Sequence, residues 1–181
     1  MPVEKTRINE NHLSPDEPRW YAIRTRFRNE KAALKQLELN GINAYLPIQK
    51  LTRRYGHKVR EVEMPLINSF VFVKITTAQY RIVIQTEYVA GFLKFGQNIL
   101  SIPEHDVELM RRLIGENTEM TVEPSTIAYQ TGDSVEVIMG PLLGLKGVLV
   151  NIQGKDKMLI DLINSGFTLQ IAINKSLLRK I

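Results

Sequence analysis

The sequence predicts an α+β protein of two domains, because the spacing of its apolar residues changes near residue 115. Before that point, strand patterns alternate with amphipathic helical patterns. After residue 128, short strand patterns follow one another with glycine-rich turns between them. The length of 181 residues and the 44% hydrophobic content suit two small domains with cores of their own. We therefore expect a disordered tail over 1–18, an N-terminal domain over 19–115, a linker over 116–127 and a C-terminal domain over 128–181.

An aromatic strand and an amphipathic helix open the first domain. The preceding tail has no apolar period and contains several prolines, which favours disorder. Trp20 begins a strand, and Asn29 is a suitable N-cap for a helix that runs to about Asn40 and stops at Gly41. The apolar stripe of this helix consists of Ala33, Leu34 and Leu37.

A basic hairpin and a strand with two apolar faces follow. After a short strand over 42–47, the segment LTRRYGHKVREVEM predicts two strand arms around Tyr55, Gly56 and His57. The strand over 68–75 places Phe70 and Phe72 on the face opposite Val71, Val73 and Ile75. The second apolar face needs a cover, which is either another layer of this chain or a partner.

The rest of the chain completes both domains. We expect a helical turn over 77–85, a strand at VAGFLKF and a helix over 104–114 that begins after Pro103 and ends at Gly115. Beyond the linker, the runs DSVEVIM, LKGVLVNI, KMLIDLI and FTLQIAI predict a small β-barrel. Gly140, Gly144 and Gly147 fall in its first connection, where positive φ or close backbone approach is expected.

Positive charge is concentrated early in the chain. The net charge is only +5, but the segment from Arg19 to Arg60 has eleven basic residues and two acidic ones. Phosphate neutralisation by such a block supplies the sequence-independent part of nucleic-acid binding. The alternative, an ordinary solvated face, stays open at this point.

Several classes of protein are disfavoured by composition. Without cysteine there is no disulfide and no thiolate metal site, and a cytoplasmic location is the default. We expect no signal peptide and no membrane span, because no apolar run has the required length. The three histidines are scattered, and no serine has a nucleophile pattern, so we expect neither a metal site, nor a cofactor, nor enzymatic activity.

The residues resemble a known family over nearly everything after the tail. GDSVEVIMGPLLGLKGVLVNI resembles the KOW motif, and WYAIRTRFRNEKAALKQL, NAYLP and NSFVFV resemble the N-terminal domain of NusG-type transcription elongation factors. The pattern is most similar to specialised paralogues of the RfaH and UpxY kind. The His-Thr-Thr contact of RfaH would fall around Tyr80, Arg81 and Ile82, and it is absent here.

The resemblance implies a monomeric, non-enzymatic factor that binds the clamp helices of the largest subunit of RNA polymerase. It implies suppression of pausing and termination at a subset of operons, polysaccharide operons among them. The KOW domain is implied to contact the small ribosomal subunit or the terminator factor Rho. The polymerase-binding residues expected from it are Phe70, Phe72 and Tyr21.

Contact with non-template DNA is a further expectation, based on the clustering of basic residues. The nucleic-acid-binding residues we expect are Arg26, Arg28, Lys35, Arg53, Arg54 and Lys58. Two alternatives remain open at this stage. Phe70 and Phe72 can be core residues under a helix, and a KOW domain also occurs in ribosome-associated RNA-binding proteins.

Overall fold

The computed structural model describes residues 11–115, 120–124, 132–162 and 166–181. It packs as two compact units, of which the first comprises Met1–Leu46 and Ser69–Pro103. The second comprises Pro47–Asn68 and Glu104–Ile181. The hairpin and the third helix of the N-terminal half group with the second unit, and the domain boundaries derived from the sequence stay predictions.

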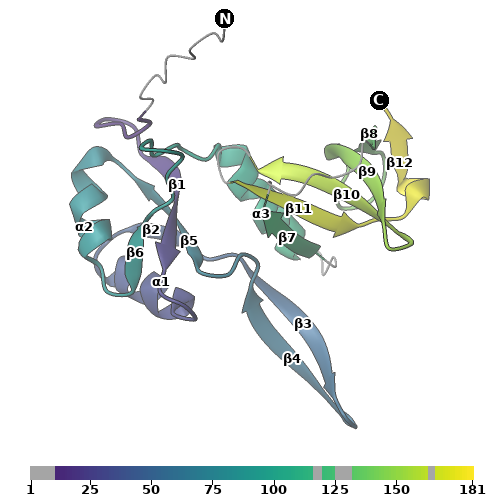
Figure 1. Cartoon of the computed structure of the whole chain (residues 1–181), viewed down its shortest axis with the longest axis horizontal. Helices are drawn as coiled ribbons and strands as arrows, with labels where there is room; N and C mark the ends of the chain where they lie inside the picture. Colours follow the sequence, from purple (N-terminus) through teal and green to yellow (C-terminus); the bar gives the residue numbers. More distant parts are fainter. Residues whose placement is uncertain (1–10, 116–119, 125–131, 163–165) are drawn as a thin grey trace, which may run out of the picture. The chain divides into compact units, whose positions relative to one another are not determined.

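The first unit is built on a four-stranded antiparallel sheet in the order β2-β5-β1-β6. Its helical elements are α1, α2 and the short 3₁₀ helix η1 (Figure 1). The bounds of the strands are β1 Arg19–Thr25, β2 Asn43–Tyr45, β5 Phe70–Ile75 and β6 Val89–Phe92. The bounds of the helices are α1 Glu30–Leu39, η1 Thr77–Gln79 and α2 Tyr80–Gln85.

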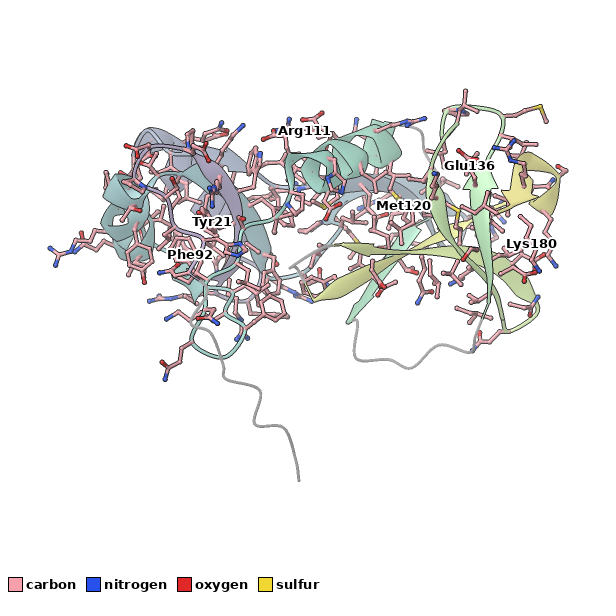
Figure 2. All side chains as sticks on the ribbon, turned by 90° about the horizontal axis from the view of Figure 1, so that it is seen from above. Tyr21, Phe92, Arg111, Met120, Glu136 and Lys180 are labelled. Atoms are coloured by element: carbon pink, nitrogen blue, oxygen red, sulfur yellow. The ribbon has the colours of Figure 1, made fainter. Side chains whose placement is uncertain are left out.

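The strand register fixes which side chains share a face of this sheet. Tyr21 lies opposite Val73, and Ala22 lies opposite Phe72. Because successive side chains point to opposite faces, Tyr21 and Phe72 lie on opposite sides. The helices cover the Tyr21 face, where the ring of Tyr80 from α2 stacks on Phe92 with centroids 5.0 Å apart. Figure 2 shows Tyr21 beside Phe92, and their ring centroids are 6.1 Å apart.

Asn29 is the N-cap residue of α1, as expected, but its side chain makes no capping hydrogen bond and its amide donates to the carbonyl of Phe27. One local expectation for this unit is wrong. The disordered tail does not extend to residue 18, since the N–H of His12 donates to the carbonyl of Ile99 and the carbonyl of Ser14 accepts from Thr77. The stop at Gly41 is confirmed, and this glycine has a φ of 73°.

The second unit contains a six-stranded antiparallel sheet in the order β12-β8-β9-β10-β11-β7, the hairpin β3–β4 and helix α3 (Figure 1). The bounds are β3 Ile48–Tyr55, β4 Lys58–Pro65, α3 Glu104–Gly115, β7 Met120–Pro124, β8 Asp133–Val137 and β9 Lys146–Ile152. The remaining elements are β10 Lys155–Leu162, β11 Phe167–Ala172, the 3₁₀ helix η2 Lys175–Leu177 and β12 Leu178–Lys180.

The C-terminal sheet confirms the predicted strands and extends them. Met158, Leu169 and Ile171 are fully buried, as expected for alternating strands around one core. The predicted linker is wrong over Met120–Pro124, because this segment forms β7 and pairs with β11. Met120 is buried, and it alternates with Val122 along this strand. Residues 116–119 and 125–131 lie outside the described residues.

The two units together form an α+β protein with a C-terminal KOW-type, SH3-like β-barrel, as the sequence predicts. Among the described residues, no helix has the length and apolar character that a membrane span requires.

Candidate polymerase and nucleic-acid interface

The three residues expected to bind polymerase do not form one exposed patch. Tyr21 is 0% exposed and Phe72 is 1% exposed, and they lie on opposite faces of the sheet. The expectation that Phe72 faces outward is therefore wrong in this structure. Phe70 alone among the three keeps part of its side chain accessible.

The face that carries Phe72 has its own aromatic packing. The ring of Tyr45, directly opposite on β2, lies 6.5 Å from the ring of Phe72. Trp20 lies on the same face and is buried, and the Lys74 ammonium lies 5.9 Å from its ring centroid. Phe72 is therefore buried, and Tyr45 and Trp20 are aromatic neighbours of it on the same face of the sheet.

Residues that precede β1 hold the side chain of Tyr21 in place. Its hydroxyl donates a hydrogen bond of 2.7 Å to the carbonyl of His12, whose ring contacts Ser101 at 3.0 Å. Burial raises the pKa of Tyr21, and the positive charge of Arg19 opposes that shift. Tyr21 therefore ties residues 12–14 to the sheet and is a core residue.

The connection between β1 and α1 exposes a basic and aromatic cluster, which we call the RFR loop and define as Arg26, Phe27 and Arg28. Phe27 is 74% exposed, and both arginines are exposed. The guanidinium of Arg28 lies 5.1 Å from the centroid of the Phe27 ring, within cation–π range. Sequence reasoning found the arginines but missed Phe27, although an aromatic residue between two arginines at the end of a strand was a usable signal.

The RFR loop is held in one conformation by hydrogen bonds on both sides. The N–H of Arg26 donates to the carbonyl of Tyr88, and the N–H of Asn29 donates to the carbonyl of Arg26. Arg28 has a φ of 59°, a left-handed conformation that is uncommon for a residue with a side chain. Such a strained position persists only where its surroundings hold it, and it suggests a functional constraint.

A buried carboxylate anchors this loop to β5. Glu30, in the first turn of α1, is 7% exposed and accepts a 2.7 Å hydrogen bond from the N–H of Ser69. A carboxylate near a helix N-terminus is also favoured by the helix dipole. Glu30 therefore fixes the start of α1 while leaving the adjacent arginines in solvent.

Lys35 extends the positive charge along α1. It is exposed, and Lys31 lies one helical turn before it on the same side. Near the loop, the carboxylate of Glu87 acts as hydrogen-bond partner of Tyr88 and raises the pKa of that phenol. Arg26, Arg28 and Lys35 are therefore all exposed in the first unit, the two arginines just before α1 and Lys35 within it.

The basic residues of the hairpin lie in the second unit and are all exposed. The register pairs Arg53 with Arg60, Arg54 with Val59 and Tyr55 with Lys58. Arg53 and Arg54 therefore point to opposite faces of the ribbon, a distinction that the sequence-based grouping did not make.

The glycines of the KOW segment have two different roles. Gly140 and Gly144 have φ values of 84° and 82°, which favour glycine. At Gly147 the conformation is ordinary, but an added Cβ would lie 2.5 Å from the carbonyl oxygen of Leu159. Gly147 is thus required by the close approach of β10.

The loop between β8 and β9 exposes apolar side chains. Met139 is 54% exposed and Leu143 is 57% exposed, and the neighbouring Ile138 is also accessible. The run IMGPLL carried this signal in the sequence, but we attributed it only to turn formation. An exposed apolar loop of this kind is suited to protein contact.

Among the described residues, no group of three or more His, Cys, Asp or Glu side chains is arranged to hold a metal ion.

The fold and these surfaces define a two-domain protein with a basic aromatic loop, a basic hairpin and an exposed apolar loop. A protein-family model described as transcription termination factor nusG matches residues 18–111, which is more than half of the chain. The chain belongs to the NusG family.

Two solved structures were matched to this chain, and the first of them supports the fold. A structure of NusG from Thermotoga maritima is similar with a TM-score of 0.56 and 22% identity, covering 91% of this chain and 98% of that one. A structure of an MjSpt4:Spt5 complex has a TM-score of 0.31 and 16% identity, covering 90% and 97% of the two chains. No curated protein matches the chain.

Proposed function

We propose that the protein is a transcription elongation factor that binds RNA polymerase and suppresses pausing and termination at a subset of operons. The observation that carries this proposal is the match of residues 18–111 to the NusG family, followed in the same chain by a KOW-type barrel. Long polysaccharide operons are the proposed targets, because the sequence is most similar to paralogues of the RfaH and UpxY kind.

The proposed polymerase contact is made with the clamp helices of the largest subunit and includes Phe70. This is the accessible aromatic residue of β5, and it lies opposite the exposed Arg24. A phenylalanine that becomes fully buried on binding contributes roughly 1.5–3 kcal/mol, and the part of that which comes from its still accessible surface is available to Phe70. Phe72 is buried on the same face as Phe70, whereas Tyr21 is buried on the opposite face of the sheet.

The RFR loop is the proposed contact with the single-stranded non-template DNA of the transcription complex. An exposed aromatic ring offers a stacking surface to a base, and the flanking Arg26 and Arg28 offer charge to phosphates. Glu30 fixes the start of α1 through the hydrogen bond that its carboxylate accepts from the N–H of Ser69. Lys35 adds charge along the same helix.

The apolar loop of the barrel is the proposed site for a protein partner, either a small-subunit ribosomal protein or Rho. Ile138, Met139 and Leu143 are its exposed apolar residues. Replacing Leu143 with Ser is expected to weaken that contact while leaving polymerase binding unchanged. Pull-downs with a ribosomal fraction and with purified Rho distinguish the two partners.

Gel-shift measurements on paused transcription complexes test the proposal at its DNA contact. We expect Arg26→Ala with Arg28→Ala to lower recruitment at least several-fold, and Phe27→Ala to lower it by one lost stacking contact of about 1–3 kcal/mol. Exposed Leu39 provides a matched control, and Leu39→Ala is expected to bind as the wild type does. Wild-type recruitment of all the loop variants would exclude the DNA contact.

Affinity capture separates this function from the alternative of a ribosome-associated RNA-binding protein. Immobilised full-length chain is expected to retain purified RNA polymerase core enzyme at physiological salt. Retention of ribosomal subunits alone, with no polymerase, would favour the alternative.

A further inference from the structure

A pocket of about 150 Å³ lies on the C-terminal sheet, apart from every surface described above. Four neighbouring strands, β7, β9, β10 and β11, contribute to it (Figure 1). We call it the lysine pocket and define it by the side chains that share one face of these strands, which are Thr121, Ile152, Lys155, Lys157, Gln170 and Ala172.

The strand register explains why these residues lie together. Lys157 lies opposite Ala172 on β11, and Gln170 lies opposite Thr121 on β7. Lys155 is two residues before Lys157 on β10, so both lysines are on the same face. The residues that alternate with them on β10 and β11 face the barrel core and are buried.

A buried amide holds one of the two ammonium groups in place. Gln170 is 6% exposed, and its carbonyl oxygen accepts a 3.1 Å hydrogen bond from Nζ of Lys157. The same oxygen accepts from the hydroxyl of Thr121 at 3.4 Å. The ammonium of Lys157 is therefore oriented before any ligand arrives, and such preorganisation lowers the entropic cost of binding.

The positive charge of the pocket has no counter-charge among the described residues. Lys155 and Lys157 form no ion pair there, and Lys157 is partly buried. Elsewhere in the same barrel, Lys175, Arg179 and Lys180 each lie within 3.0 Å of a carboxylate oxygen. A cation that is partly removed from water is stabilised by a nearby anion. The lysine pocket is therefore suited to an anionic ligand.

We propose that the lysine pocket binds the phosphate monoester group of a small molecule. This inference goes beyond the proposed function and does not depend on it. A phosphate monoester carries about −1.5 to −2 charges at pH 7, which matches two ammonium groups better than a single carboxylate does. Lysine binds phosphate as a point charge, whereas planar carboxylates are typically recognised by the two-pronged guanidinium of arginine, which the pocket lacks.

The size of the pocket favours a terminal phosphate group. Pockets for drug-sized ligands measure roughly 300–1,000 Å³, so a pocket of about 150 Å³ accommodates one chemical group and leaves the rest of the ligand outside. Ile152 and Ala172 offer apolar contact to the carbon atoms next to the phosphate. A phosphodiester within a polynucleotide has one negative charge and a substituent on both sides, and it fits this pocket less well.

Nuclear magnetic resonance titration of the isotope-labelled full-length chain tests the proposal. The probes are adenosine monophosphate, adenosine and inorganic phosphate. We expect adenosine monophosphate to cause saturable shifts in the amide signals of Lys157 and Gln170. Inorganic phosphate should shift the same signals, and adenosine should not shift them.

Substitutions of single lysines separate the pocket from general positive charge. Lys157→Gln should weaken the binding of adenosine monophosphate at least about tenfold, because a charge-assisted hydrogen bond is lost. Lys155→Gln, at an exposed position, should weaken it several-fold without affecting the fold. The matched control is Lys146→Gln, which removes the same charge from an exposed site opposite Glu136 on β8 and should bind as the wild type does.

The pH dependence gives an independent readout of the monoester. Affinity for adenosine monophosphate should rise as pH increases through about 6, where its phosphate loses the second proton. The proposal would be overturned by the absence of saturable shifts, by equal affinity for adenosine, or by equal weakening in Lys146→Gln. Tighter binding of an acidic peptide, or of a short single-stranded RNA without a terminal phosphate, would also overturn it.

Discussion

Strand β5 and the hairpin β3–β4 have similar alternating sequences and opposite environments. In β5, Val71, Phe72 and Val73 are consecutive and all buried. In the hairpin, Val59 is 59% exposed although it lies in a regular ladder. The difference teaches that alternation fixes which residues share a face, while the neighbouring layers determine whether that face is core or surface.

The largest expected effect is on the buried face of β5. Phe72→Ala should lower the free energy of unfolding by about 3–5 kcal/mol, because it removes a fully buried ring. Phe70→Ala should cost roughly 1 kcal/mol, since that ring is only partly buried. Urea denaturation of both variants measures the difference, and equal costs would contradict the separation of core from surface along β5.

A second test concerns the barrel, where the close approach of β10 to β9 leaves no room for a side chain at Gly147. Gly147→Ala should lower the stability of the barrel by about 1–3 kcal/mol, because the new methyl group meets the carbonyl of Leu159. Gly144→Ala meets no neighbour but must hold a positive φ, which costs about 1–2 kcal/mol. Thermal melts compare the stabilities of the two variants. An unchanged melting temperature in Gly147→Ala would contradict the close contact between Gly147 and β10.

Matched valine substitutions sharpen the comparison between core and ribbon. Val73→Thr places a hydroxyl in a fully buried site and should cost about 1–3 kcal/mol. Val59→Thr makes the same change on the exposed ribbon and should alter stability by less than about 0.5 kcal/mol. Similar costs for the two, measured by chemical denaturation, would mean that the hairpin is covered in solution.

The fold was predictable from local pattern to a large extent, and the site was less so. Local signals predicted the helices after Asn29 and Pro103 and the turn at Gly56. These signals are the apolar periodicity and the capping and turn-forming residues, which act within a few positions of the chain. The burial of Phe72 was not predictable, since it depends on Tyr45 and other residues brought together by tertiary structure. Strand β7 was missed because its partner β11 is distant in sequence.

The smallest expected effect is the acid sensitivity of the C-terminal sheet. Hydrogen bonding to Lys175 lowers the pKa of Asp156, and hydrogen bonding to Arg179 lowers the pKa of Glu136. A lowered folded pKa contributes stability that is present above the unfolded pKa and lost as pH falls through the folded value. Melts from pH 6 down to about pH 3 should therefore show falling stability, and Lys175→Ala should reduce that dependence. If Lys175→Ala keeps the wild-type dependence of stability on pH, the ion pair between Lys175 and Asp156 does not contribute to it.

Transcription in vitro is the most direct test of the central claim. The template carries a leader pause and a downstream terminator, and the reaction contains purified bacterial RNA polymerase with or without the full-length protein. We expect the protein to shorten the pause and to raise the read-through fraction, and we expect Phe70→Ala to weaken both effects while remaining folded. Unchanged pausing and termination at saturating protein would contradict the claim.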